Sequence, residues 1–130
     1  MIQHTTQLRV RYKETDQMGV AYYSNYLVWF EVARTELLRK AGYPYSRIEQ
    51  DMGLRLMVAS AECFYKMPAR YDDLLSIVCL ISKTGNTSIT FACKVFRDKD
   101  LLAQGNTVHV CTDCSGKPTR IPQALKEVLA

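Results

Sequence analysis

The sequence predicts one α+β domain in which a five-stranded antiparallel β-sheet wraps around one long α-helix. Two observations predict this class: one long segment carries apolar residues at helical spacing, and five other segments alternate with period two. The order is one strand, the long helix, a short helix and four strands. Because one helix cannot cover both faces of such a sheet, we expect the sheet to curve around it and to leave an edge or face for a second subunit.

The first strand and the long helix follow each other closely. Residues 6–12 alternate apolar and polar side chains, which is typical of a strand. Next, apolar residues recur at spacings of four, three, four and four, which predicts a helix with a broad buried face; they are Tyr26, Phe30, Ala33, Leu37 and Ala41. Gly42 suits a left-handed C-terminal cap and Pro44 prevents continuation, so the helix is expected to end there.

The remaining elements are shorter. Ser46 and Glu49 have the spacing of a capping box, which predicts a second helix ending at Gly53. Turn-forming residues separate four period-two segments, which we expect to be strands: 58–66, 74–83, 88–97 and 102–112. Residues 122–129 predict a short last helix.

Composition restricts the function classes. The chain has 130 residues, of which 48% are hydrophobic and 23% charged, so we expect one globular domain over residues 1–130. No apolar run approaches the ~18–20 residues of a membrane span, and the N-terminus lacks the apolar core of a signal peptide. The net charge of +4 is dispersed, which argues against nucleic acid and is compatible with an anionic small ligand.

Cysteine and histidine usage argues against metal and triad chemistry. The five cysteines are odd in number and scattered, which indicates free thiols and a cytoplasmic protein. Cys111 and Cys114 form a C-x-x-C pair, but zinc would need a second ligand pair and none has a suitable spacing. With two histidines and no G-x-S-x-G elbow, we expect neither a metal site nor a Ser–His–Asp hydrolase.

Carboxylates are the remaining candidates for chemistry. Asp16 lies in a loop just before the long helix, where a general base or nucleophile would sit beside the positive end of the helix dipole. The structural alternative is an aspartate that bonds the amides of its own turn. Glu31 is the competing carboxylate, with a solvated or ion-paired helix face as its alternative, and Glu62 is expected at the surface.

A dense group of tyrosines surrounds Asp16 in the sequence. Tyr12, Tyr22, Tyr23 and Tyr26 fall within 15 residues. Core packing and interface burial explain most of them, and the functional alternative is an aromatic wall around a substrate group.

The same segment carries a family resemblance. The chain resembles the 4-hydroxybenzoyl-CoA thioesterase family, a branch of the hotdog-fold acyl-CoA thioesterases, and is most similar to the bacterial type encoded beside the Tol–Pal envelope proteins. The matching positions are Arg11-Tyr12-x-x-Thr15-Asp16-x-x-Gly19-Val20-x-Tyr22-Tyr23-x-x-Tyr26-x-x-Trp29-Phe30-Glu31-x-Ala33-Arg34, then Tyr65-x-x-Pro68-Ala69-x-Tyr71-x-Asp73 and Gly85-x-Thr87-Ser88. The resemblance implies a hotdog fold and a homodimer or homotetramer with active sites at the dimer interface.

The resemblance also implies catalytic roles. Asp16 is the catalytic carboxylate, and the backbone amide of Tyr23 binds the oxyanion. Asp16 either attacks the thioester carbonyl, which gives a mixed anhydride, or deprotonates a water; both routes stay open. No cofactor is expected, because coenzyme A is part of the substrate. Tyr23 is a departure, since many Tol–Pal-associated members carry a histidine there.

The substrate-binding candidates have structural alternatives, which are a solvated surface for each lysine and core packing for Met57 and Val58. Rough alignment with the family supplies the phosphate-binding candidates. For the coenzyme A phosphates they are Lys66, Lys83 and the turn that contains Asn86 and Ser88. For the acyl group they are Met57, Val58 and the aromatic ring of Tyr22.

The function expected is hydrolysis of an acyl-CoA to the free acid and coenzyme A. The alternative is a non-catalytic hotdog protein that binds acyl-CoA or acyl-carrier protein, although a binder does not need Asp16. An enoyl-CoA hydratase is a third possibility, but no Asp–His pair of that kind is present. The acyl group, and the choice between coenzyme A and an acyl-carrier protein as donor, stay open.

Overall fold

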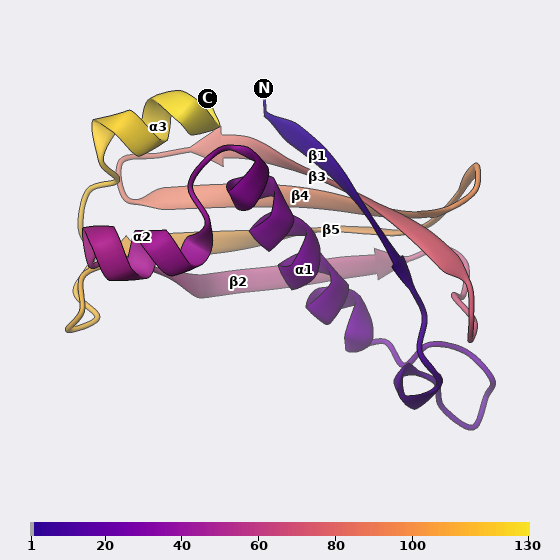
Figure 1. The fold of residues 1–130 in the computed structure, drawn as a ribbon. Helices are drawn as coiled ribbons and strands as arrows, with labels where there is room; N and C mark the ends of the chain where they lie inside the picture. The colour runs from indigo at the N-terminus through magenta and orange to yellow at the C-terminus, as the bar shows by residue number, and fades with distance from the viewer. Residues whose placement is uncertain (1) are drawn as a thin grey trace.

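A computed structural model describes residues 2–130. Figure 1 shows one long helix lying across one face of a five-stranded sheet. The elements are β1 (Gln3–Arg9), the 3₁₀ turn η1 (Tyr12–Glu14), α1 (Asn25–Lys40), α2 (Tyr45–Met52), β2 (Arg55–Tyr65), β3 (Leu74–Thr84), β4 (Ser88–Arg97), β5 (Asp100–Thr112) and α3 (Gln123–Leu129).

The sheet order is β1-β3-β4-β5-β2, and every neighbouring pair is antiparallel. The predicted fold class is therefore confirmed. The apolar face of α1 packs on the inner face of the sheet, as the two periodicities require. The fully buried side chains include Trp29, Phe30, Ala33, Leu37, Leu75, Ile77, Cys79, Ile89, Phe91 and Val95.

Several predicted boundaries are wrong, and β1 and β2 each begin three residues earlier than predicted, at Gln3 and Arg55. The first strand ends at Arg9, and Tyr12 begins a 3₁₀ turn with its side chain 78% exposed, because the chain leaves the sheet there to form a loop. The capping box at Ser46 does not form: Pro44 is the N-cap of α2, so Ser46 lies one residue inside the helix. Gly53 ends α2 in the left-handed conformation, with φ 65°.

The strands give the molecule two distinct ends. The loop end consists of residues 10–24, the end of β2 and the segment 66–73. The far end consists of the start of β2 and the turn between β3 and β4. In Figure 1 the loop end is at lower right and the far end is at left, beside α2 and α3.

β2 has one unpaired edge. Among residues 2–130 it pairs only with β5, so its other edge keeps free backbone donors and acceptors. Its side chains are also uncovered: Met57, Val58 and Phe64 are between 52% and 56% exposed. An exposed apolar edge strand is a typical pairing surface for another chain.

Candidate active site

Asp16 is held in a tight loop that closes on itself. Its amide donates to the Val20 carbonyl (3.0 Å), and its carbonyl accepts from the Gly19 amide (3.0 Å). Gly19 has φ 79°, which a residue with a side chain rarely adopts. The Met18 amide donates to Asp16 Oδ1 (2.9 Å), so the structural alternative of an aspartate bonding its own turn is present. Among the described residues, Oδ2 has no donor and is left for chemistry.

Asp16 lines a cavity of about 450 Å³ at the loop end. Aromatic and apolar side chains dominate its walls, and Lys66 adds one positive charge at the surface. The other lining residues are Met18, Val20, Ala21, Tyr22, Tyr23, Tyr26, Tyr65, Met67 and Pro68. A mostly apolar pocket with one carboxylate and one cation suits an organic substrate that carries negative charge elsewhere.

The two residues just before α1, Tyr23 and Ser24, have free amides, and Tyr23 lines this cavity. Over residues 2–130, no acceptor bonds the amides of Tyr23 or Ser24, and Ser24 makes no side-chain cap. The first amides of a helix have no partner within the helix and lie at its positive end. They are therefore suited to stabilising an oxyanion.

Tyr65 fixes this turn from β2. Its hydroxyl donates to the Tyr23 carbonyl at 2.9 Å, and its ring packs edge-on against Tyr23 and Tyr26. Burial, and next its hydrogen bond with Cys63, raise the pKa of Tyr65 to about 12, so the hydroxyl stays protonated as a donor. Residue types alone gave no sign of this contact, since the two tyrosines are 42 positions apart.

Sequence reasoning also missed Glu14, which is only 4% exposed. Its Oε1 accepts from the Arg11 amide (2.7 Å), and its Oε2 accepts from Trp29 Nε1 on α1 (3.0 Å). The available signal was a carboxylate two residues before Asp16 in a chain with a single tryptophan.

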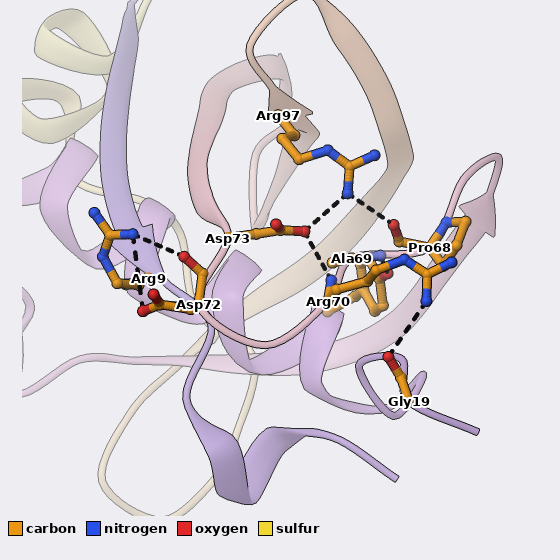
Figure 2. Close-up of polar contacts among 9 residues, drawn as sticks. Arg9, Gly19, Pro68, Ala69, Arg70, Asp72, Asp73 and Arg97 are labelled. Atoms are coloured by element: carbon orange, nitrogen blue, oxygen red, sulfur yellow. Dashed lines mark hydrogen bonds and ion pairs between the residues drawn. The ribbon is translucent and has the colours of Figure 1, made fainter. Parts of the chain in front are cut away.

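The segment that follows β2 holds the loop from its other side. Figure 2 shows Asp73 Oδ2 accepting from Arg97 Nη1 and from the Arg70 amide, both at 2.8 Å. The Arg70 side chain reaches the Gly19 carbonyl (3.5 Å). The Ala69 carbonyl accepts from the Ala21 amide (2.8 Å). The Asp16 loop is thus tied to the sheet as well as to α1.

The predicted site residues fall into two groups. Asp16, Tyr22, Tyr23 and Lys66 meet at the loop end, where all four line the cavity. The others belong to the far end: Met57, Val58, Lys83, Asn86 and Ser88. Within one chain the groups are well separated, since the seven residue-to-residue steps of β2 from Val58 to Tyr65 span about 23 Å.

The other titratable candidates lie apart from Asp16. Glu31 is exposed on α1, where it accepts from Thr35 (3.4 Å) and lines a second cavity of about 210 Å³ with Arg34 and His109. His109 is 2% exposed, with Nε2 bonded to Thr107 (2.9 Å), so it is a core histidine. Among the described residues, no cluster of three or more histidine, cysteine or acidic side chains has metal-ligand geometry.

The whole chain is similar to proteins of one family. A family model described as "Thioesterase-like superfamily" matches residues 10–129. The chain belongs to the thioesterase-like superfamily. It is 31% identical to the acyl-CoA thioesterase YbgC of Haemophilus influenzae, over 92% of this chain and 88% of that protein.

Solved structures agree with this thioesterase-like assignment. Protein AQ1494 from Aquifex aeolicus superposes with a TM-score of 0.92 at 37% identity, covering 98% of this chain and 99% of that one. The DHNA-CoA thioesterase of Staphylococcus aureus gives 0.88 at 31% identity, covering 92% and 81%. A 4-hydroxybenzoyl CoA thioesterase gives 0.90 over the full length of both chains at 21% identity, which shows the hotdog fold alone. The predicted resemblance and the predicted enzyme class, a thioester hydrolase, are confirmed.

Proposed function

We propose that this chain hydrolyses acyl-CoA thioesters to the free acid and coenzyme A, and that Asp16 is the catalytic carboxylate. The observation that carries the proposal is the cavity that Asp16 and Tyr23 line together, at the point where the amides just before α1 have no partner among residues 2–130. Relatives named acyl-CoA thioesterases support the substrate class.

The proposed reaction uses these two groups in different ways. Asp16 either attacks the thioester carbonyl to give a mixed anhydride, which water then hydrolyses to the free acid, or takes a proton from a water that attacks the carbonyl directly. In both cases coenzyme A leaves as the thiolate. The amide of Tyr23 donates to the oxygen on which negative charge develops; one such donor contributes roughly 3–4 kcal/mol in well-studied hydrolases. A thiolate leaves readily, so the scheme needs no histidine acid and no cofactor.

The proposal includes a homodimer with active sites at its interface. An antiparallel copy paired along the free edge of β2 would place the far end of one chain beside the loop end of the other. The far-end candidates would then complete the partner's site: Met57 and Val58 toward the acyl group, Lys83, Asn86 and Ser88 toward the phosphates. A tetramer would require a further interface.

The cellular location and the acyl donor are also part of the proposal. Five free cysteines support a reducing, cytoplasmic location for the domain. Over residues 2–130, no helix combines the length and the apolar character that a membrane span needs. An acyl-carrier protein is the alternative donor, since it carries the same thioester.

Thiol release from a panel of acyl-CoAs tests the proposal: benzoyl, 4-hydroxybenzoyl, short aliphatic and long aliphatic. We expect wild-type turnover on at least one, and Asp16→Asn to lower kcat by about 10²–10⁴-fold, as for loss of a positioned base. Glu31→Gln is the control for the competing carboxylate, and Asp51→Asn is a control for an exposed aspartate on α2.

Each contrary result has a distinct meaning. If folded Asp16→Asn keeps full activity while Glu31→Gln loses it, Glu31 is the catalytic carboxylate. If the wild type binds acyl-CoA by calorimetry but releases no thiol from any donor, acyl-carrier protein included, the chain is a binding protein.

A further inference from the structure

Glu14 joins the loop that carries Asp16 to the helix that carries the oxyanion amides. Its carboxylate bonds the Arg11 amide on one side and Trp29 Nε1 on the other, at 2.7 and 3.0 Å. Arg11 Nη2 lies 3.5 Å from Oε2 and adds an opposite charge. The side chain thus spans from the start of η1 to the second turn of α1.

The backbone of Glu14 makes a second set of bonds. Its carbonyl accepts from the Tyr22 amide (2.8 Å) and from Asn25 Nδ2 (2.9 Å). Tyr22 and Asn25 flank the two residues with unpaired amides. One residue therefore holds both ends of the loop between Thr15 and Ala21 and fixes the start of α1 against it.

The site is built for an ionised carboxylate. Burial acts to raise the pKa of Glu14, but hydrogen bonds from Arg11 and Trp29 outweigh it and leave the pKa below its ordinary value. A buried carboxylate is retained only where donors surround it. A neutral side chain of similar shape would keep fewer of these donors paired.

We propose that Glu14 is a positioning residue for the reaction, which sets Asp16 at the correct distance from the Tyr23 amide. The inference rests on the proposed function, because it assigns Glu14 an effect only through Asp16. Small errors in the distance between the Asp16 carboxylate and the Tyr23 amide would lower the rate, since catalytic geometry must be held within about 0.5 Å. A purely structural role would instead affect folding and leave the chemistry of the folded protein unchanged.

The test is a double-mutant cycle with Glu14→Gln and Asp16→Asn, assayed by thiol release on the best acyl-CoA. We expect Glu14→Gln to lower kcat about 10- to 100-fold with KM within about twofold. The Kd for a non-hydrolysable thioether analogue of that acyl-CoA should not change. In the Asp16→Asn background, Glu14→Gln should cause no further loss, because the group through which it acts is gone.

Trp29→Phe gives a second, independent variant in case Glu14→Gln does not fold. It keeps a buried aromatic ring but removes the Nε1 donor together with one ring of the indole, so its stability is measured beside its activity. We expect a smaller loss of kcat that also disappears in the Asp16→Asn background. Glu36→Gln, which changes an exposed glutamate of the same helix, is the matched control and should retain wild-type kcat.

Wild-type kcat in folded Glu14→Gln and Trp29→Phe would overturn the inference. An equal loss in the presence and absence of the Asp16 carboxylate would also overturn it, because Glu14 would then act on something other than Asp16. Full activity of Asp16→Asn would refute the proposed function instead, and with it the basis of the inference, so the two failures are distinguishable.

Discussion

The two ends of the sheet differ in how complete they are. At the loop end, a carboxylate, unpaired helix amides and a cavity of about 450 Å³ are brought together by contacts within one chain. At the far end, Met57 and Val58 are exposed on an edge strand, and Lys83 and Asn86 lie on the surface. The candidate catalytic groups therefore lie together in one chain with Tyr22 and Lys66, whereas the far-end substrate candidates lie apart from that cavity.

This difference separates two roles within one small domain: holding the candidate catalytic groups and pairing with a second chain. At the loop end, several hydrogen bonds hold the loop that carries Asp16 against both α1 and the sheet. Along β2, which joins the two ends, one strand edge has no partner among residues 2–130 and is available to another chain. In a two-fold dimer, the loop end of each chain would lie beside the far end of its partner, so the molecule would contain two such sites.

The largest expected effect comes from mixing two damaged chains. Asp16→Asn removes the loop-end chemistry, and Val58→Asp places a charge in the proposed acyl pocket, so each homodimer should be nearly inactive. A heterodimer, coexpressed with two different tags and purified by both, would contain one site with neither change. We expect about half of the wild-type activity per dimer, because one of two isologous sites is intact.

The control for this experiment is a heterodimer of wild type and Asp16→Asn, which should show the same activity. A doubly tagged heterodimer as inactive as its parents would show that the two ends do not meet in one site. Size-exclusion chromatography of Val58→Asp checks separately that the charge has not simply prevented pairing of β2.

A second prediction concerns acid stability, which should depend on the far end. Burial, and next the positive charge of Arg34, lower the pKa of His109 from 6.5 to about 4. The unfolded chain therefore binds a proton more readily than the folded one between these values, and stability falls as the pH drops from about 6.5 toward 4. The loss should reach about 1–3 kcal/mol in the free energy of unfolding.

Urea unfolding at pH 7 and pH 5 measures this loss. His109→Gln keeps a polar side chain without the titration, so it should lose less stability than wild type between the two pH values. His4→Gln, which changes the other histidine, should behave as wild type. An identical pH dependence in all three proteins would assign the acid sensitivity to carboxylates.

Local patterns were enough to predict most of the fold. β4 occupies residues 88–97 as predicted, because a clean alternation between two turns depends only on neighbouring residues. The end of α1 was equally clear, since Gly42 adopts φ 89° just before Pro44. The first strand was extended too far because its alternation continues into η1, where the chain has already left the sheet.

The site was predicted less completely, because its support is non-local. Asp16 and Tyr23 are close in sequence and were found there by resemblance. The burial of Glu14 depends on Trp29, 15 residues later, and the bond from Tyr65 crosses 42 positions. The separation of Val58 from Asp16 depends on the direction of β2, which no residue pattern reveals.

The smallest expected effect tests the link between the edge strand and the loop end. Tyr65→Phe keeps the ring packing but removes the hydroxyl that bonds the Tyr23 carbonyl. One lost hydrogen bond of this kind is worth about 1 kcal/mol, so we expect the free energy of unfolding to fall by about that amount and kcat to fall by roughly fivefold at most. Tyr12→Phe removes a hydroxyl from a tyrosine that is 78% exposed and should leave kcat unchanged. If Tyr65→Phe also leaves kcat unchanged in thiol release, β2 does not help to orient the amides of α1, and its contribution to the site is confined to pairing with a partner.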